Sequence, residues 1–296
     1  MKSLFLLTPF TVIAMQFCGK ADLPPAAPLS LDEATKNKAL EVLREGLKSD
    51  DFWPAIHAAE GLTLAGHGDE VIAYLKPKLG TETDDQKRCG IARELIRAGD
   101  NSEGEAVMAA ILKGDDDHGH IHAAESLYKV FKVGDREAMD AAFAKTDNVK
   151  LHLMAAGALV RQGDEDALAA IREAYKTGDD DSIQIGAWLL ARVGDESDIP
   201  LLKSRIGEVK DDPVIHAYVN HALATLGDPE GKAALAENLN SDDGPIRTYA
   251  ATFAGDAGMK EVTPRLIEML DDPHPDAAYR AAQSLLFFTT GKPMPR

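Results

Sequence analysis

The chain has 296 residues, with 49 acidic and 32 basic side chains and a formal net charge of -17 at pH 7. Such a surface repels phosphate backbones and anionic lipid headgroups, so nucleic acid and acidic membranes are not expected partners. Aromatic residues make up only 6% of the chain, while alanine and leucine are abundant. This composition favours helices over strands and predicts an all-α protein.

Residues 1–21 have the composition of an export signal. Lys2 precedes an apolar run from Leu4 to Phe17, and a stretch of small residues follows. The run is shorter than the roughly 20 residues that a membrane-spanning helix needs. Residues 22–30 are rich in proline and alanine and form the expected tether. We therefore expect an exported bacterial protein in the periplasm or associated with the cell envelope.

Cys18 leaves two ways of processing this signal open. Its Cys-Gly sequence resembles the lipidation site of bacterial lipoproteins, although Phe17 stands where that family has a small residue. The alternative is ordinary cleavage near Ala21. A lipid on Cys18 would be the expected link to a membrane. In both cases Cys89 remains without a disulfide partner, and we expect it to be a small buried thiol.

From residue 31 onward two landmarks alternate, and the clearest copy of the unit runs from Asp147 to Tyr175. One landmark is an acidic pair or cluster expected to cap the next helix. The other is a glycine, usually followed by aspartate, that is expected to end a helix in the left-handed conformation. Successive glycines lie about 29 to 35 residues apart, which is typical of a stacked helix-turn-helix repeat. They are Gly68, Gly99, Gly134, Gly163, Gly194, Gly227, Gly258 and Gly291.

The second helix of most units carries two adjacent alanines followed by a leucine or similar group, as at Ala155, Ala156 and Leu159. Small residues at this point let neighbouring helices approach closely. The combination of an acidic turn, a basic residue, the alanine pair and Gly-Asp resembles HEAT repeats, and more narrowly the short bacterial type also found in phycobilin lyases. The resemblance covers Leu31 to Gly291 and implies a right-handed α-solenoid of about eight helical pairs. Residues 292–296 form a short tail.

Histidines suggest an alternative based on metal. The sequence DDDHGHIH brings together side chains that bind divalent ions, but acidic caps followed by a histidine at a repeat position give the same string without a metal, and this explanation is preferred. The alternative function is a metal-binding protein or metal-dependent enzyme, resembling either the di-iron deoxyhypusine hydroxylases or the bilin lyases. The hydroxylases use adjacent His-Glu pairs as ligands, and no histidine here precedes a glutamate. The candidate ligands are His118, His120, His122, Asp116 and Asp117.

The preferred function is a non-enzymatic binding scaffold. In HEAT-like arrays the second helices line the concave face, and tryptophan at such a position is typical of a partner anchor. The alternative for Trp188 is packing between units as part of the core. We expect an acidic concave strip, a protein or peptide partner that is basic or neutral, and no cofactor. The candidate partner-binding residues are Trp188, Glu60, Arg93, Glu125, His221 and Tyr218.

Overall fold

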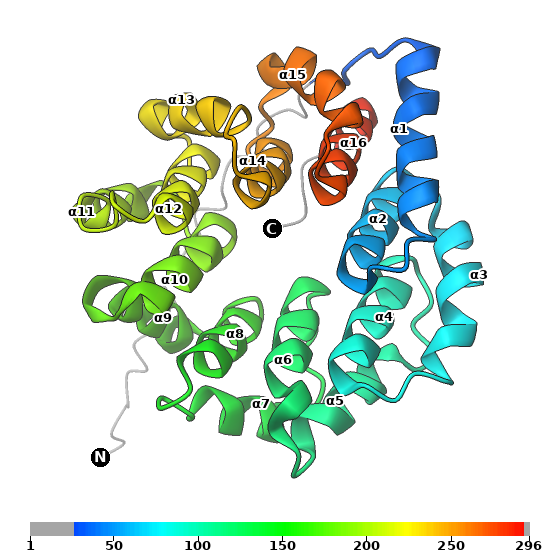
Figure 1. Cartoon of the computed structure of the whole chain (residues 1–296). Coiled ribbons are helices and arrows are strands. Elements are labelled where there is room, and N and C mark those ends of the chain that lie inside the picture. The colour runs from blue at the N-terminus through cyan, green and yellow to red at the C-terminus, as the bar shows by residue number, and fades with distance from the viewer. Residues whose placement is uncertain (1–26, 293–296) are drawn as a thin grey trace, which may run out of the picture.

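The computed structural model describes residues 27–292, and their regular structure is entirely helical. Eight helices form an inner row and eight an outer row (Figure 1). The outer helices are α1 (Glu33–Gly46), α3 (Gly68–Leu79), α5 (Gly104–Lys113), α7 (Arg136–Phe143), α9 (Glu165–Thr177), α11 (Ile199–Arg205), α13 (Pro229–Asn238) and α15 (Thr263–Glu268). The inner helices are α2 (Phe52–Leu64), α4 (Asp85–Arg97), α6 (His120–Lys129), α8 (Val149–Val160), α10 (Asp180–Val193), α12 (Pro213–Thr225), α14 (Gly244–Asp256) and α16 (Pro275–Thr290).

Four short 3₁₀ helices lead into or out of these elements. They are η1 (Asp117–Gly119), η2 (Glu196–Asp198), η3 (Lys260–Val262) and η4 (Met269–Asp271). The predicted α-solenoid of eight helical pairs is therefore confirmed. No helix within residues 27–292 is long and apolar enough to cross a membrane.

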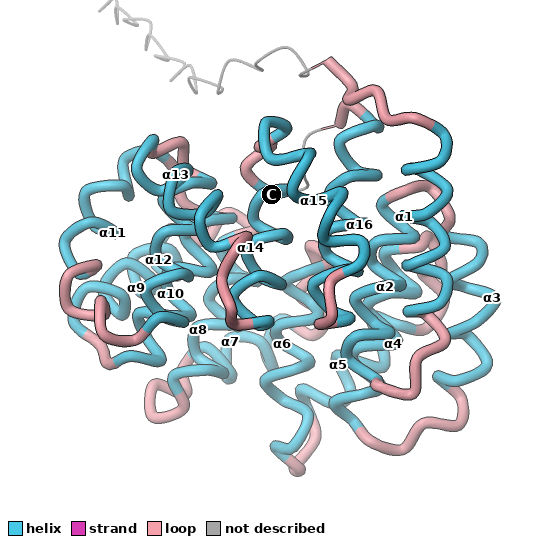
Figure 2. The backbone as a smooth tube through the Cα atoms, turned by 45° about the horizontal axis from the view of Figure 1, so that its top comes forward, coloured by secondary structure: helices cyan, strands magenta, loops and turns pink. Residues whose placement is uncertain are grey.

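The array closes into a ring, which the repeat pattern did not predict. Each inner helix packs against the next inner helix in the chain, and the last one, α16, packs against both α1 and α2. Figures 1 and 2 show the two ends of the array side by side. A linear repeat array needs end caps, because its first and last units expose apolar faces. Here each end unit covers the other.

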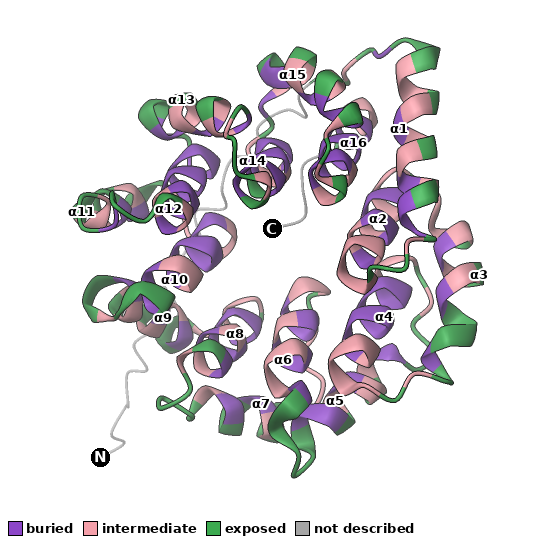
Figure 3. Cartoon of the chain, viewed as in Figure 1, coloured by how far each residue is buried: buried purple, intermediate pink, exposed green. Residues whose placement is uncertain are grey.

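The alanine pairs place the inner helices close together. Both members of each pair are fully buried, including Ala58 and Ala59 on α2 and Ala281 and Ala282 on α16. Buried residues of all eight units belong to one apolar cluster, and Figure 3 shows the buried surface concentrated on the inner helices. The predicted role of the alanines in close helix packing is confirmed.

Acidic residues begin many of the helices, as predicted. Asp84 accepts a hydrogen bond from the Lys87 amide, 3.0 Å away, and Asp135 and Asp164 cap α7 and α9 in the same way. Two caps lie one residue away from the acids expected from the pattern. Asn148 caps α8, and Asp179 caps α10.

Two of the eight landmark glycines do not adopt the expected left-handed conformation. At the end of α2 this conformation belongs to Gly66, with φ +95°, while Gly68 is the first residue of α3. Gly68 is constrained by space instead, because a Cβ there would lie 2.9 Å from the Ala98 carbonyl oxygen. Gly194 ends α10 in an extended conformation, with φ -83°. The glycine landmark therefore marks helix ends, but it serves more than one backbone geometry.

The seam between the ends of the array has specific polar contacts. The Leu29 amide donates to the Phe288 carbonyl, 2.9 Å away, so the segment before α1 is fixed to α16. His57 Nδ1 lies 2.7 Å from the Asp276 carboxylate. These contacts join the first two helices to the last one, and they hold the inner helices around a shared centre.

Candidate functional site

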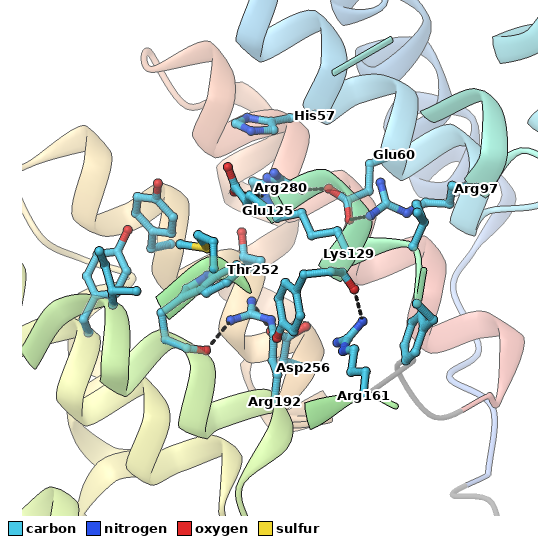
Figure 4. Close-up of a pocket in the computed structure, with 18 of the residues that line it drawn as sticks. His57, Glu60, Arg97, Glu125, Lys129, Arg161, Arg192, Thr252, Asp256 and Arg280 are labelled. Carbon is cyan, nitrogen blue, oxygen red and sulfur yellow. Dashed lines mark hydrogen bonds and ion pairs between the residues drawn. The ribbon is translucent and has the colours of Figure 1, made fainter. Parts of the chain in front are cut away.

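The centre of the ring contains a cavity of about 520 Å³ to which all eight inner helices contribute. We call it the ring cavity, and Figure 4 shows part of its lining. Its volume falls in the range of ordinary ligand pockets, about 300–1,000 Å³. The lining residues are His57, Glu60, Leu64, Ile96, Arg97, Glu125, Tyr128, Lys129, Val130, Phe131, Lys150, Met154, Arg161, Asp181, Gln184, Ile185, Trp188, Arg192, Tyr218, Tyr249, Thr252, Asp256, Arg280 and Gln283.

The expected acidic concave strip is wrong, because basic residues outnumber acidic ones in the lining. The basic residues are Arg97, Lys129, Lys150, Arg161, Arg192 and Arg280, and the acidic ones are Glu60, Glu125, Asp181 and Asp256. The net charge of the whole chain does not describe the charge of the cavity, because many carboxylates lie at helix ends and cap helices there. Asp84, Asp135 and Asp164 are examples. The centre of the ring is thus more basic than the chain as a whole.

Glu60 connects three inner helices at the ring cavity. Its carboxylate lies 2.7 Å from Arg280 Nη1 on α16 and 3.2 Å from Arg97 Nη2 on α4. Burial alone would raise the pKa of Glu60, but Arg97 and Arg280 outweigh it and hold this pKa well below its ordinary value. Glu60 is therefore an ionised bridge across the seam.

Glu125 and Lys129 form a second pair, 2.6 Å apart, one turn from each other on α6. Burial favours the neutral form of both groups. Burial lowers the pKa of Lys129 below its ordinary value. For Glu125 the charges of Lys129 and Arg93 outweigh burial and lower its pKa to about 2. The pair therefore brings two opposite charges to the cavity wall.

Trp188 forms part of the cavity wall and is only 9% exposed. Its ring meets that of Tyr128 edge to face at 5.4 Å. The Arg192 guanidinium carbon lies 4.6 Å from the ring centroid, and Lys129 Nζ lies 5.4 Å from it. Trp188 thus packs between units and also borders the cavity, and its role as a partner anchor stays a prediction.

Arg161 and Tyr128 are cavity residues that sequence reasoning missed. Arg161 follows the end of α8, and its guanidinium carbon lies 4.1 Å from the Tyr128 ring centroid and 3.8 Å from that of Phe131. The sequence contained a pattern that could have identified this arginine. Arg97, Arg161 and Arg192 each stand two residues before a helix-ending glycine, and all three line the ring cavity.

The six residues predicted to contact a partner separate into two groups. Trp188, Glu60, Glu125 and Tyr218 line the ring cavity. Arg93 and His221 do not, and this corrects their predicted placement on the open concave surface. Arg93 is 3% exposed and bonds Glu94 at 2.7 Å. His221 is fully buried against Phe253, with Nε2 3.1 Å from Asn238 Nδ2.

The residues of the metal alternative do not converge. His118 Nε2 lies 3.4 Å from Asp84, whereas His120 Nε2 lies 3.0 Å from the Gly114 carbonyl oxygen. His122 stacks on Trp53, with ring centroids 5.0 Å apart. Asp116 caps η1 through the His118 amide, and Asp117 begins that 3₁₀ helix. Within residues 27–292 no group of three or more His, Cys, Asp or Glu side chains has the arrangement of a metal site.

The two cysteines differ in what the structure shows of them. Cys89 is buried and free, as expected, and burial raises the pKa of its thiol to about 12. This makes it a core residue and a poor nucleophile. Cys18, the candidate lipidation residue, lies outside the described residues, as do the export signal and most of the tether.

Comparison with known proteins supports a HEAT-repeat protein. Residues 209–286 match the family model for HEAT repeats. The matched segment begins just before α12 and ends within α16. No curated protein matches the chain. The narrower phycobilin-lyase-like type stays a prediction.

One solved structure is similar over most of its length. It is the crystal structure of an engineered protein from the Northeast Structural Genomics Consortium, and it is 16% identical to this chain. The alignment covers 87% of this chain and 98% of the engineered one, with a TM-score of 0.29. Similarity at this level adds nothing about function.

Proposed function

We propose that the chain is a non-enzymatic binding scaffold whose ring cavity receives a segment of a protein or peptide partner. The observation that carries this proposal is the convergence of all eight inner helices on one cavity. Repeat arrays of this kind bind partners on the surface that their inner elements form. In this chain that surface encloses a pocket.

The size of the cavity limits what can enter it. A volume of about 520 Å³ accommodates a ligand of a few residues, and a folded domain does not fit. The partner therefore contributes an extended segment or a chain terminus, while its remaining contacts lie on the rim. Trp188, Tyr218 and Tyr249 provide aromatic surface for such a segment.

The cavity lining also changes the expected charge of the partner. Six basic and four acidic side chains favour a segment that is neutral or acidic, in place of the basic or neutral one expected from the composition. This preference concerns only the part that enters the cavity. Basic regions of the same partner would still be attracted by the overall charge of -17.

We also propose that the scaffold works outside the cytoplasm of a bacterial cell. The support is the sequence of residues 1–21 followed by the Pro/Ala-rich segment 22–30. Lipidation at Cys18 would link the ring to a membrane through the Pro/Ala-rich segment, and cleavage near Ala21 would release it. Mass spectrometry of the mature N-terminus from the source cell distinguishes the two outcomes.

Site-specific photo-crosslinking tests the binding function. A photoreactive residue at Thr252, which lines the ring cavity, should capture a defined partner segment in the source cell. The matched control is the same residue at Lys176, an exposed position on the outer helix α9. Identical products from both positions, or no product specific to position 252, would argue against a binding role for the cavity.

A further inference from the structure

The charges that line the ring cavity pair with one another, except for one. Each of the four lining carboxylates has a basic partner among the lining residues. The pairs are Asp181 with Lys150 at 3.3 Å, Glu125 with Lys129 at 2.6 Å, Asp256 with Arg192 at 2.6 Å, and Glu60 with both Arg97 and Arg280. Arg161 is the remaining cation, and no carboxylate within residues 27–292 forms an ion pair with it.

Arg161 is held in place without a neutralising partner. Its Nη1 donates to the Tyr128 carbonyl oxygen, 2.8 Å away, and its guanidinium lies between the rings of Tyr128 and Phe131. Stacking and one backbone hydrogen bond fix the orientation of the group, but they leave its charge uncompensated. A guanidinium held in this way is preorganised for an anion.

Two polar atoms at this site, one in the Arg161 guanidinium and one in the neighbouring Tyr128 side chain, lack a well-formed hydrogen bond. Arg161 Nε and Tyr128 Oη are both shielded from solvent, and neither has a hydrogen bond of good geometry within the described part of the chain. The Tyr128 hydroxyl and the Arg161 guanidinium lie close enough to interact, but neither group neutralises the other. The Tyr128 side chain is fully buried and lines the cavity. A buried donor without an acceptor costs folding free energy, so such atoms call for an explanation. One explanation is an acceptor that belongs to a ligand.

The charges around Arg161 reinforce the need for an anion. Burial and the positive charges of Arg192 and Arg97 lower the pKa of Arg161 and together outweigh the Tyr128 side chain, which raises it. Lys129 and Arg192 also flank Trp188 at the cavity wall. An anion entering here would relieve an existing repulsion as well as form new hydrogen bonds.

We propose that the ring cavity contains a carboxylate-binding subsite formed by Arg161 and Tyr128, with Trp188 beside it for an apolar or aromatic part of the same ligand. This inference rests on the proposed function of the cavity as a binding site. A carboxylate offers acceptors to both orphaned donors. Its single negative charge matches the one unpaired cation, whereas a phosphate dianion would exceed it. In a peptide partner, an acidic side chain or the C-terminal carboxylate supplies the group.

Titration calorimetry of the full chain with simple probes tests this subsite. The probes are 3-phenylpropionate, its neutral amide and inorganic phosphate. We expect the acid to bind at least about 10-fold more tightly than the amide, because only the acid forms charge-assisted hydrogen bonds. Phosphate should bind more weakly than the acid, since it has no apolar part to contact Trp188.

Three variants assign the effect to the subsite. Arg161→Gln should abolish the discrimination between acid and amide, and Arg136→Gln, on an exposed arginine of α7, should preserve it. Tyr128→Phe removes only the orphaned hydroxyl. It should therefore weaken the acid several-fold without lowering the unfolding temperature of the free chain. This variant keeps the test valid if Arg161→Gln folds poorly.

Several outcomes would overturn the proposal. These are equal affinity for acid and amide, discrimination that survives in both Arg161→Gln and Tyr128→Phe, failure of the acid to bind, and tighter binding of phosphate than of the acid. The crosslinking experiment at Thr252 is independent of ligand charge. Partner capture there without carboxylate preference would refute the subsite alone, and loss of both results would refute the binding function itself.

Discussion

Glu60 on α2 accepts a hydrogen bond from Arg280 on α16 at 2.7 Å, although the two residues lie 220 positions apart in the sequence. The bond crosses the one interface of the inner row that joins the two ends of the repeat array. Elsewhere along the row, short connections keep neighbouring units together. At this interface the contacts within residues 27–292 are made by side chains and by the Leu29–Phe288 backbone hydrogen bond. Closing such a long loop costs chain entropy, so the stability of the ring depends on this seam.

The first prediction concerns the charge at the seam. Glu60→Gln should destabilise the chain by about 2–4 kcal/mol, because it leaves Arg97 and Arg280 close together without their shared carboxylate. Urea unfolding measures the change. Glu33→Gln is the control, since that side chain is 80% exposed and pairs only with Lys36 on the same helix. Equal stability of the two variants would contradict a structural role for Glu60.

The second prediction compares a crowded glycine at the end of α1 with an open one in the turn that follows α11. A Cβ on Gly46 would lie 2.7 Å from the Tyr279 ring on α16 and 2.8 Å from Ala58 Cβ, whereas nothing lies within 4 Å of the Cβ position of Gly207. Gly46→Ala should therefore cost about 1–3 kcal/mol through overpacking, even though alanine is the better helix former. Gly207→Ala should be nearly neutral.

Hydrogen exchange locates the effect of the Gly46→Ala variant. Faster exchange should appear in α16 and α1, which meet at the seam, before it appears in α8 on the far side of the ring. Uniform acceleration through the whole chain would mean that the ring opens only by global unfolding. That result would contradict the view of the seam as the weakest interface.

The sequence predicted the units well, because each unit carries its own signals. The spacing of the glycines and the alanine pairs at positions such as Ala155 and Ala156 reflect contacts between neighbouring helices, and these contacts repeat. Ring closure is different. It arises from the sum of small rotations between successive units, and no residue pattern records that sum. His57 and Asp276 meet only because the rotations add up to a closed circle.

The site was predicted in part for the same reason. Glu60, Glu125 and Trp188 occupy the position between the alanine pair and the following leucine, which was expected on the concave face, and all three line the ring cavity. Arg93 and His221 occupy the same position in their units but are buried away from the cavity. The charge of the cavity could not be predicted from the net charge of the chain, because it depends on which acidic residues cap helices and which line the cavity.

The third prediction is a loss of stability in mild acid that depends on His221. Burial, together with the charge of Arg192, lowers the pKa of His221 to about 3 in the folded chain, against an ordinary value of 6.5. The unfolded chain therefore binds a proton that the folded chain excludes. The stability contributed by neutral His221 is complete above pH 6.5 and falls as the pH drops from there towards 3.

The variant His221→Leu isolates this contribution. Between pH 7.5 and pH 5 the unmodified chain should lose about 2 kcal/mol more unfolding free energy than the variant, as follows from the linkage of one proton. Urea unfolding at the two pH values measures both losses. All other titrating groups are common to the two proteins, so their effects cancel in the difference. Equal losses would show that His221 takes up its proton without unfolding.

The last prediction concerns Trp188, whose burial complicates the simplest test of a partner anchor. Trp188→Ala would remove a ring that packs on Tyr128 and Arg192, and the resulting void should cost about 3–5 kcal/mol, so lost binding could reflect lost folding. Trp188→Phe keeps an aromatic ring in the wall but reduces its area at the ring cavity. We expect this variant to unfold within about 2 kcal/mol of the unmodified chain and yet to reduce partner crosslinking at Thr252.

Trp53→Phe is the matched control for that experiment. Trp53 packs against His122 and Phe52 and does not line the ring cavity, so its replacement removes the same atoms from a different place. A structural effect common to tryptophan loss would lower crosslinking in both variants. A contact made by the partner would lower it only in Trp188→Phe. Crosslinking that is unchanged in Trp188→Phe would place the partner elsewhere on the cavity wall, and Trp188 would then serve only to pack the inner helices together.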